Sequence, residues 1–228
     1  MKKLIKLLIL IIISLSVYII YQKTNNTTYT ITSFGDKLSL GINSYGITEY
    51  SYIDYYKDYL KNTKKNIIIN RKYSNQTQTI REVLKEIKQT PNIKRTLADT
   101  DILIITLGYN DLLEGLSIIE NINETKLNEL IKEISANYNE LLSEIRKYYH
   151  EKIIVIGYYE SNKDEYYINK GIKKLNLILN STDVEFINTY NILNNKKKYF
   201  SNPNSYYPNH YGYNAISKEI IGLGLAKK

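Results

Sequence analysis

Apolar and polar residues alternate along most of this chain in two regular patterns. From residue 29 on, short runs of β-branched residues alternate with longer stretches whose apolar residues recur at helical spacing. Short continuous apolar runs are typical of parallel strands covered on both faces, and the 3.6-residue period is typical of amphipathic helices. The alternation predicts an α/β fold: a three-layer α/β/α sandwich around a central, mostly parallel five-stranded sheet.

The elements follow from the positions of these runs. The predicted strands cover residues 29–33, 66–70, 101–107, 152–157 and 184–188. The predicted helices cover residues 51–60, 77–88, 124–149, 164–179 and 213–225. In a parallel sheet, ligands bind beyond the carboxyl ends of the strands, so the residues that follow each predicted strand are the candidates for function.

The N-terminus has a different pattern, because residues 4–21 are apolar on every face and only Lys6 interrupts them. A helix of this length spans ~27 Å, close to the ~30 Å hydrocarbon core of a bilayer. Lys2, Lys3 and Lys6 predict a cytoplasmic N-terminus and a domain outside the cell. The run ends in bulky residues that do not fit a signal-peptidase site. We expect an uncleaved transmembrane signal anchor over 1–22, a polar linker over 23–28 and one domain over 29–228.

Composition excludes several kinds of site. The chain has no cysteine, so disulfides, cysteine nucleophiles, thiolate metal sites and a lipoprotein anchor are excluded. The net charge is +8, but three of the lysines lie within the first six residues, and the excess of basic residues in the rest of the chain is modest. No basic stripe interleaved with aromatic residues suggests nucleic acid, and no cluster has metal-ligand spacing. We therefore expect no cofactor, no metal and no nucleic-acid partner.

Four polar clusters lie after predicted strands or before the last predicted helix, at residues 34–41, 70–77, 108–111 and 202–213. In this order they resemble the four blocks of the SGNH (GDSL) hydrolase family, and the resemblance covers the domain from about residue 29 onward. The residues that fit the first, third and fourth blocks are Gly35, Asp36, Leu38 and Gly41, then Gly108, Asn110 and Asp111, then Pro208, Asn209, Gly212 and Tyr213.

The resemblance implies ester or acyl hydrolysis by a Ser–His–Asp triad, but this chain differs at all three triad positions. Lys37 stands at the nucleophile position, Tyr207 at the base position and Asn204 at the position of the orienting acid. In the family, the oxyanion hole is formed by residues of the second and third blocks. The glycine of the second block is replaced here by Asn75, whereas Gly108 and Asn110 match the third block.

These substitutions remove the chemistry of the triad. A lysine amine is protonated at neutral pH, and its attack on an ester would leave an amide that does not turn over. A tyrosine is neutral at pH 7 and a poor base, and an asparagine has no charge to stabilise an imidazolium. We therefore expect a catalytically degenerate member of the family that binds an acylated glycan or lipid of the cell envelope.

Two alternatives remain. In the first, the chain is an active esterase with a rearranged site that uses Ser39, two residues after the nucleophile position, or His210, three residues after the base position. Ser39 also fits a hydroxyl at a helix start, and His210 a surface or capping histidine. In the second alternative, the domain has a structural or partner-binding role and the pocket has none.

Overall fold

A single sheet of five parallel strands forms the centre of the computed structural model, which describes residues 9–18, 28–62, 66–160, 165–180, 183–201 and 206–225. The strand order is β2-β1-β3-β4-β5, and every neighbouring pair is parallel. The strands are β1 (Thr28–Gly35), β2 (Asn66–Ser74), β3 (Ile102–Thr106), β4 (Ile153–Ile156) and β5 (Glu185–Ile187). The predicted α/β fold with five strands is confirmed.

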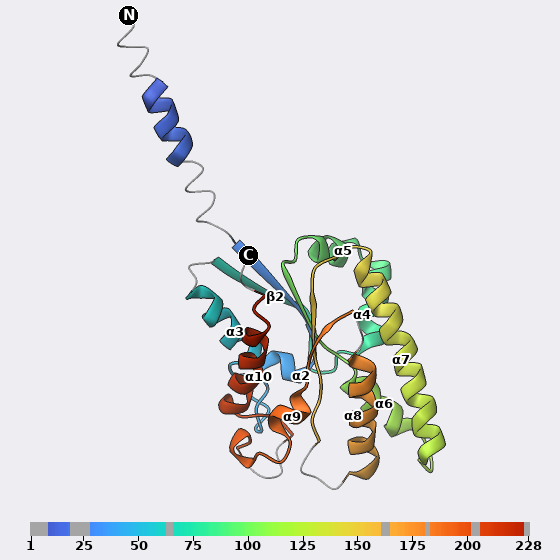
Figure 1. Ribbon diagram of the computed structural model, residues 1–228. Coiled ribbons are helices and arrows are strands. Elements are labelled where there is room, and N and C mark those ends of the chain that lie inside the picture. Colours follow the sequence, from blue (N-terminus) through green and yellow to red (C-terminus); the bar gives the residue numbers. More distant parts are fainter. Residues whose placement is uncertain are drawn as a thin grey trace, which may run out of the picture.

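Helices cover both faces of the sheet, which gives the three layers (Figure 1). One face is covered by α4 (Ile80–Gln89), α5 (Pro91–Ala98), α6 (Tyr109–Ile118), α7 (Glu124–Arg146) and α8 (Tyr166–Leu179). The other face is covered by α2 (Lys37–Leu40), α3 (Tyr52–Lys61), α9 (Thr189–Leu193), the 3₁₀ helix η1 (Lys197–Tyr199) and α10 (His210–Gly222).

The two faces of the sheet carry two hydrophobic cores. In β3, Leu103 and Ile105 pack against one helical layer, while Ile102 and Ile104 pack against the other. Successive side chains of a strand point to opposite faces, so a strand covered on both faces needs an apolar residue at every position. This is the physical reason for the continuous apolar runs in the sequence.

Several helix boundaries differ from the sequence prediction. The last helix begins at His210 rather than at residue 213, because the side chain of Asn209 accepts hydrogen bonds from the N–H groups of Tyr211 and Gly212 and so caps the helix earlier. No helix was predicted over α6, which starts directly after β3. The backbone turns there at Gly108, whose φ of 118° favours glycine.

Part of the predicted anchor lies within the described residues, where residues 9–18 form a helix. Residues 1–8 and 19–27, which hold the rest of the predicted anchor and nearly all of the linker, lie outside the described part of the chain. Among the helices that the structure describes, none is both long and apolar enough to cross a membrane.

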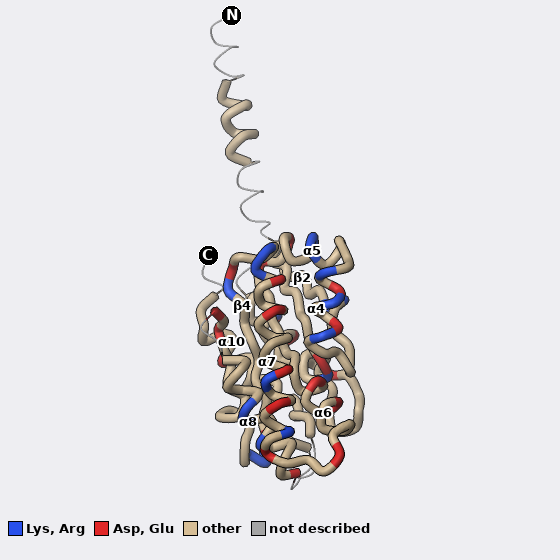
Figure 2. Tube along the Cα trace, turned by 90° about the vertical axis from the view of Figure 1, so that its right-hand side faces the viewer, with Lys and Arg blue, Asp and Glu red and all other residues tan. Residues whose placement is uncertain are grey.

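Charged residues of both signs are interspersed on the side of the domain formed by α4, α7 and α8 (Figure 2). Ion pairs join these helices to one another, among them Lys88–Glu140 and Lys170–Glu124. Exposed pairs of this kind contribute only about 0–1 kcal/mol each to stability. This side of the domain therefore has a mixed, solvated surface without a field of a single sign.

Candidate active site

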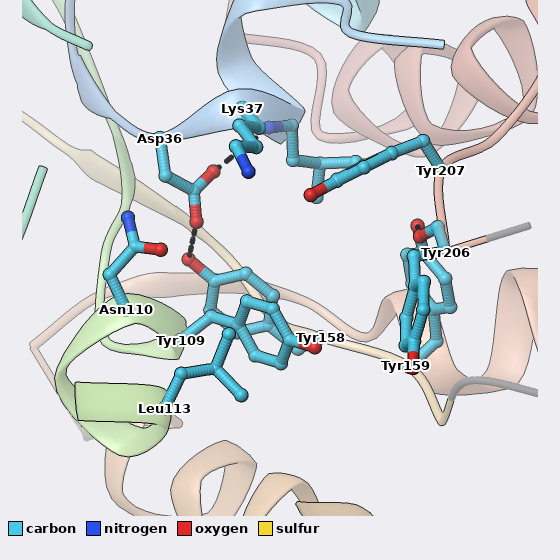
Figure 3. Close-up of a pocket in the computed structure, with 10 residues that line it drawn as sticks. Asp36, Lys37, Tyr109, Asn110, Leu113, Tyr158, Tyr159, Tyr206 and Tyr207 are labelled. Atoms are coloured by element: carbon cyan, nitrogen blue, oxygen red, sulfur yellow. Dashed lines mark hydrogen bonds between the residues drawn. The ribbon is translucent and has the colours of Figure 1, made fainter. Parts of the chain in front are cut away.

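A small pocket with a cavity volume of about 50 Å³ lies at the carboxyl end of the sheet. Its ten lining residues follow β1, β3 and β4 or precede α10, and five of them are tyrosines. They are Asp36, Lys37, Leu38, Tyr109, Asn110, Leu113, Tyr158, Tyr159, Tyr206 and Tyr207. Figure 3 shows these side chains around one space, so the parallel topology gathers segments that are far apart in the sequence.

The turn after β1 brings Lys37 to the pocket. Asp36 caps α2, since its Oδ1 accepts a hydrogen bond from the Leu38 N–H at 2.9 Å. Lys37 is the first residue of this short helix, and its Nζ lies 5.7 Å from the centre of the Tyr207 ring. The residues at the predicted nucleophile and base positions thus line the same pocket (Figure 3). Asn204, at the third triad position, lies outside the described residues.

Asp36 is the only acidic residue among the described residues that line the pocket, and it is 3% exposed. Its Oδ2 accepts a hydrogen bond from the Tyr158 hydroxyl at 2.6 Å. Burial raises the pKa of Asp36 to about 6, while the hydrogen bonds from Tyr158 and Leu38 act in the opposite direction. Within the described residues, no three His, Asp or Glu side chains gather closely enough to hold a metal ion.

The groups at the oxyanion-hole positions make hydrogen bonds within the protein. Asn110 lines the pocket, but its Nδ2 donates to the carbonyl oxygens of Gln78 at 2.9 Å and Gln76 at 3.3 Å. In Figure 3 its amide nitrogen points away from the tyrosines. The backbone N–H of Asn75 donates to the carbonyl of Gly35 at 3.0 Å, and Asn75 does not line the pocket. These two donors are therefore engaged by protein carbonyls.

The two residues considered as replacements for the triad, Ser39 and His210, do not line the pocket. Ser39 is fully buried, and its Oγ donates to the backbone carbonyl of Asp36 at 2.7 Å. His210 is exposed at the first position of α10, with its ring centre 3.9 Å from that of Tyr211. The structure does not bring either side chain together with Lys37 and Tyr207.

A cluster of tyrosines forms the wall of the pocket, and sequence reasoning missed it. The rings of Tyr109 and Tyr158 stack with their centres 5.4 Å apart, and the Tyr159 hydroxyl donates to the Tyr206 carbonyl at 2.6 Å. The pKa values of Tyr109, Tyr158 and Tyr159 are raised, chiefly by burial, so these hydroxyls stay neutral. The chain has 24 tyrosines, and only the position of these few beyond β3 and β4 distinguishes them.

Comparisons with known proteins agree with this architecture. Residues 31–220 match the family described as GDSL-like Lipase/Acylhydrolase. No curated protein sequence matches the chain significantly. Among solved structures, the lipase Lip_vut3 from a goat rumen metagenome is similar with a TM-score of 0.71 and 23% identity, over 89% of this chain and 99% of that one. A catalytic mutant of Axe2, an acetylxylan esterase from Geobacillus stearothermophilus, is similar with a TM-score of 0.63 and 14% identity, over 89% and 95% of the two chains.

The family match covers most of the chain, and the matched region contains the residues that line the pocket and all of the sheet except the first three residues of β1. The structural similarities extend over nearly the full length of both solved structures. The fold, the order of the sequence blocks and the position of the pocket beyond the strands all agree. This chain belongs to the GDSL-like lipase/acylhydrolase family.

Proposed function

We propose that this chain binds an acyl-bearing glycan of the cell envelope in the tyrosine-lined pocket and does not cleave it. The observation that carries the proposal is the composition of the pocket. Among the described residues, the ten that line it include no serine, threonine or histidine, and Lys37 and Tyr207 stand at the positions that the sequence comparison assigns to the nucleophile and the base. Loss of the triad in subtilisin lowers kcat by about 10⁶-fold, so a pocket of this composition is suited to binding and not to hydrolysis.

The oxyanion-hole positions support the same conclusion. Residual catalysis without a triad depends on donors that are free to stabilise an oxyanion, and removal of one such donor costs about 10²–10³-fold in rate. Here the amide of Asn110 and the backbone N–H of Asn75 already donate to carbonyl groups of the protein. A bound ester would therefore find neither a nucleophile nor these two donors.

The size and position of the pocket favour a glycan over a membrane lipid. A cavity of about 50 Å³ suits a short substituent such as an acetyl group better than a long acyl chain. In the proposal, the N-terminal segment anchors the chain in the membrane, and the domain begins at the start of β1. The pocket lies at the other end of this eight-residue strand, roughly 25 Å away. In this arrangement the pocket opens away from the bilayer, toward the wall glycans.

The test uses the full chain in right-side-out membrane vesicles that have been washed with alkaline carbonate, and measures the binding of acetylated wall-glycan fragments. We expect the vesicles to retain the chain and to bind the fragments without releasing acetate. Leu113→Trp fills the pocket from α6 and should weaken binding at least tenfold. Ile118→Trp is the matched control, since it changes an 81% exposed residue of the same helix that does not line this pocket.

Each outcome bears on a separate part of the proposal. Release of the chain by carbonate would contradict the anchor. Equal binding by the Leu113→Trp variant and the unaltered chain would contradict the assignment of the pocket as the binding site. Release of acetate by the unaltered chain, at a rate above that of the fragments alone, would contradict the absence of cleavage.

A further inference from the structure

No described residue of the pocket forms an ion pair with the Lys37 ammonium. None of the eleven ion pairs among the described residues includes Lys37. The Lys37 Nζ lies over the ring of Tyr207, 5.7 Å from the ring centre. A contact of this kind holds a cation at an aromatic face without providing an anionic partner.

The acidic residue next to Lys37 in the chain does not serve as this partner. Asp36 has both carboxyl oxygens engaged, one by the Leu38 N–H at 2.9 Å and the other by the Tyr158 hydroxyl at 2.6 Å. It is 3% exposed, so a ligand in the pocket has little access to it. Lys37 is less buried and lines the pocket. The described lining of the pocket therefore presents one accessible cation and one enclosed carboxyl group.

We propose that the pocket recognises a carboxylate, which the Lys37 ammonium binds at the position where the family has its nucleophile. The inference rests on the proposed binding function and narrows its ligand to an acyl substituent that ends in a carboxylate. A carboxylate forms a charge-assisted hydrogen bond with an ammonium, whereas a neutral ester offers only a carbonyl oxygen. Among acyl groups that fit the pocket, a lysine in place of serine thus favours one whose free end carries a carboxylate over a neutral one such as acetyl.

The walls of the pocket suit an organic carboxylate better than an inorganic anion. The stacked rings of Tyr109 and Tyr158 present apolar faces to the carbon skeleton of a ligand. Phosphate sites commonly combine several N–H donors with arginine or a helix N-terminus, and the described lining of this pocket has a single cationic side chain. A short carboxylate with a few carbon atoms satisfies both the cation and the aromatic walls.

Two small probes that differ in one charge test the inference on the full chain in detergent micelles. Monomethyl succinate carries a free carboxylate, and dimethyl succinate has the same skeleton without a charge. Binding is measured by chemical-shift titration. We expect monomethyl succinate to bind at least tenfold more tightly than dimethyl succinate. Lys37→Met should abolish this difference, while Lys37→Arg, which keeps the charge, should retain most of it.

The controls separate this inference from the proposed function. Thermal unfolding of each variant checks that the fold is kept. Equal or tighter binding of dimethyl succinate without hydrolysis would overturn the carboxylate preference and leave the proposed function intact. Hydrolysis of either ester by the unaltered chain would overturn the proposed function itself. Displacement of monomethyl succinate by equimolar inorganic phosphate would overturn the choice of a carboxylate over other anions.

Discussion

Replacement of Gly35 by alanine is expected to lower the free energy of unfolding by about 3 kcal/mol, the upper end of the usual cost of overpacking a core. A Cβ at Gly35 would lie 2.4 Å from Ser39 Oγ and 2.5 Å from Ser39 Cβ. Ser39 cannot easily move away, since it is fully buried on α2 and its Oγ is bonded to the carbonyl of Asp36. Chemical denaturation of the full chain measures the loss.

Two further variants show whether the contact with Ser39 is the cause. Ser39→Gly removes the clashing atoms, so its combination with Gly35→Ala should destabilise the chain by clearly less than the sum of the two single changes. Gly222→Ala is the control, because a Cβ there meets no atom within 4 Å and the position is helical. It should be neutral or slightly stabilising. Full additivity of the Gly35 and Ser39 changes would show that the two residues do not interact.

The second large expected effect is a loss of stability as the pH rises from about 4 to 6, through two buried carboxyl groups. Burial is the largest cause that raises the pKa values of Asp36 and Asp111, each from 3.8 to about 6. For both groups the folded chain binds the proton more tightly than the unfolded chain. Their contribution to stability is therefore fully present below pH 4 and is lost by about pH 6. A shift of this size corresponds to at most about 3 kcal/mol per group.

Asp111→Asn isolates one of these two groups. Asp111 is 4% exposed; its Oδ2 accepts a hydrogen bond from the Ile80 N–H at 2.9 Å, while its Oδ1 has no partner among the described residues. Asparagine keeps an acceptor for Ile80 and removes the charge. Urea denaturation should show nearly equal stability of variant and unaltered chain at pH 4, and a variant more stable by about 1–3 kcal/mol at pH 8.

Asp58 on α3, whose side chain is 46% exposed, provides the control, and Asp58→Asn should change stability by less than about 0.5 kcal/mol at either pH. If the difference between the Asp111→Asn variant and the unaltered chain were the same at pH 4 and pH 8, Asp111 would not titrate between them. The account of its buried, half-satisfied carboxyl group would then be wrong.

The strands and the long helices of this protein could be predicted because buried positions show up as apolar patterns in the local sequence. β4 is apolar at every position and β3 at every position but its last, Thr106, since both faces of these strands are covered. The long helix α7 keeps a regular apolar period because one face packs on the core. Patterns of this kind do not depend on distant contacts, so they can be read from local sequence.

The parts that the sequence did not predict depend on long-range contacts or on single turns. α6 has a mixed composition, and its start depends on the left-handed turn at Gly108. The hydrogen bond from the Asn110 amide to the Gln78 carbonyl joins the first turn of α6 to a residue 32 positions earlier in the chain. The pairing of Tyr158 with Asp36 joins residues that are 122 positions apart. A tyrosine-rich sequence alone does not indicate which tyrosines form such contacts.

The central claim of this account is that the chain keeps the hydrolase frame and has lost hydrolysis. The most direct test is the turnover of a short-chain nitrophenyl ester by the full chain beside the triple reversion Lys37→Ser, Asn204→Asp, Tyr207→His. The account predicts no hydrolysis above the uncatalysed rate for the unaltered chain and measurable turnover for the reversion. Turnover by the unaltered chain that is abolished by Ser39→Ala or His210→Ala would contradict it.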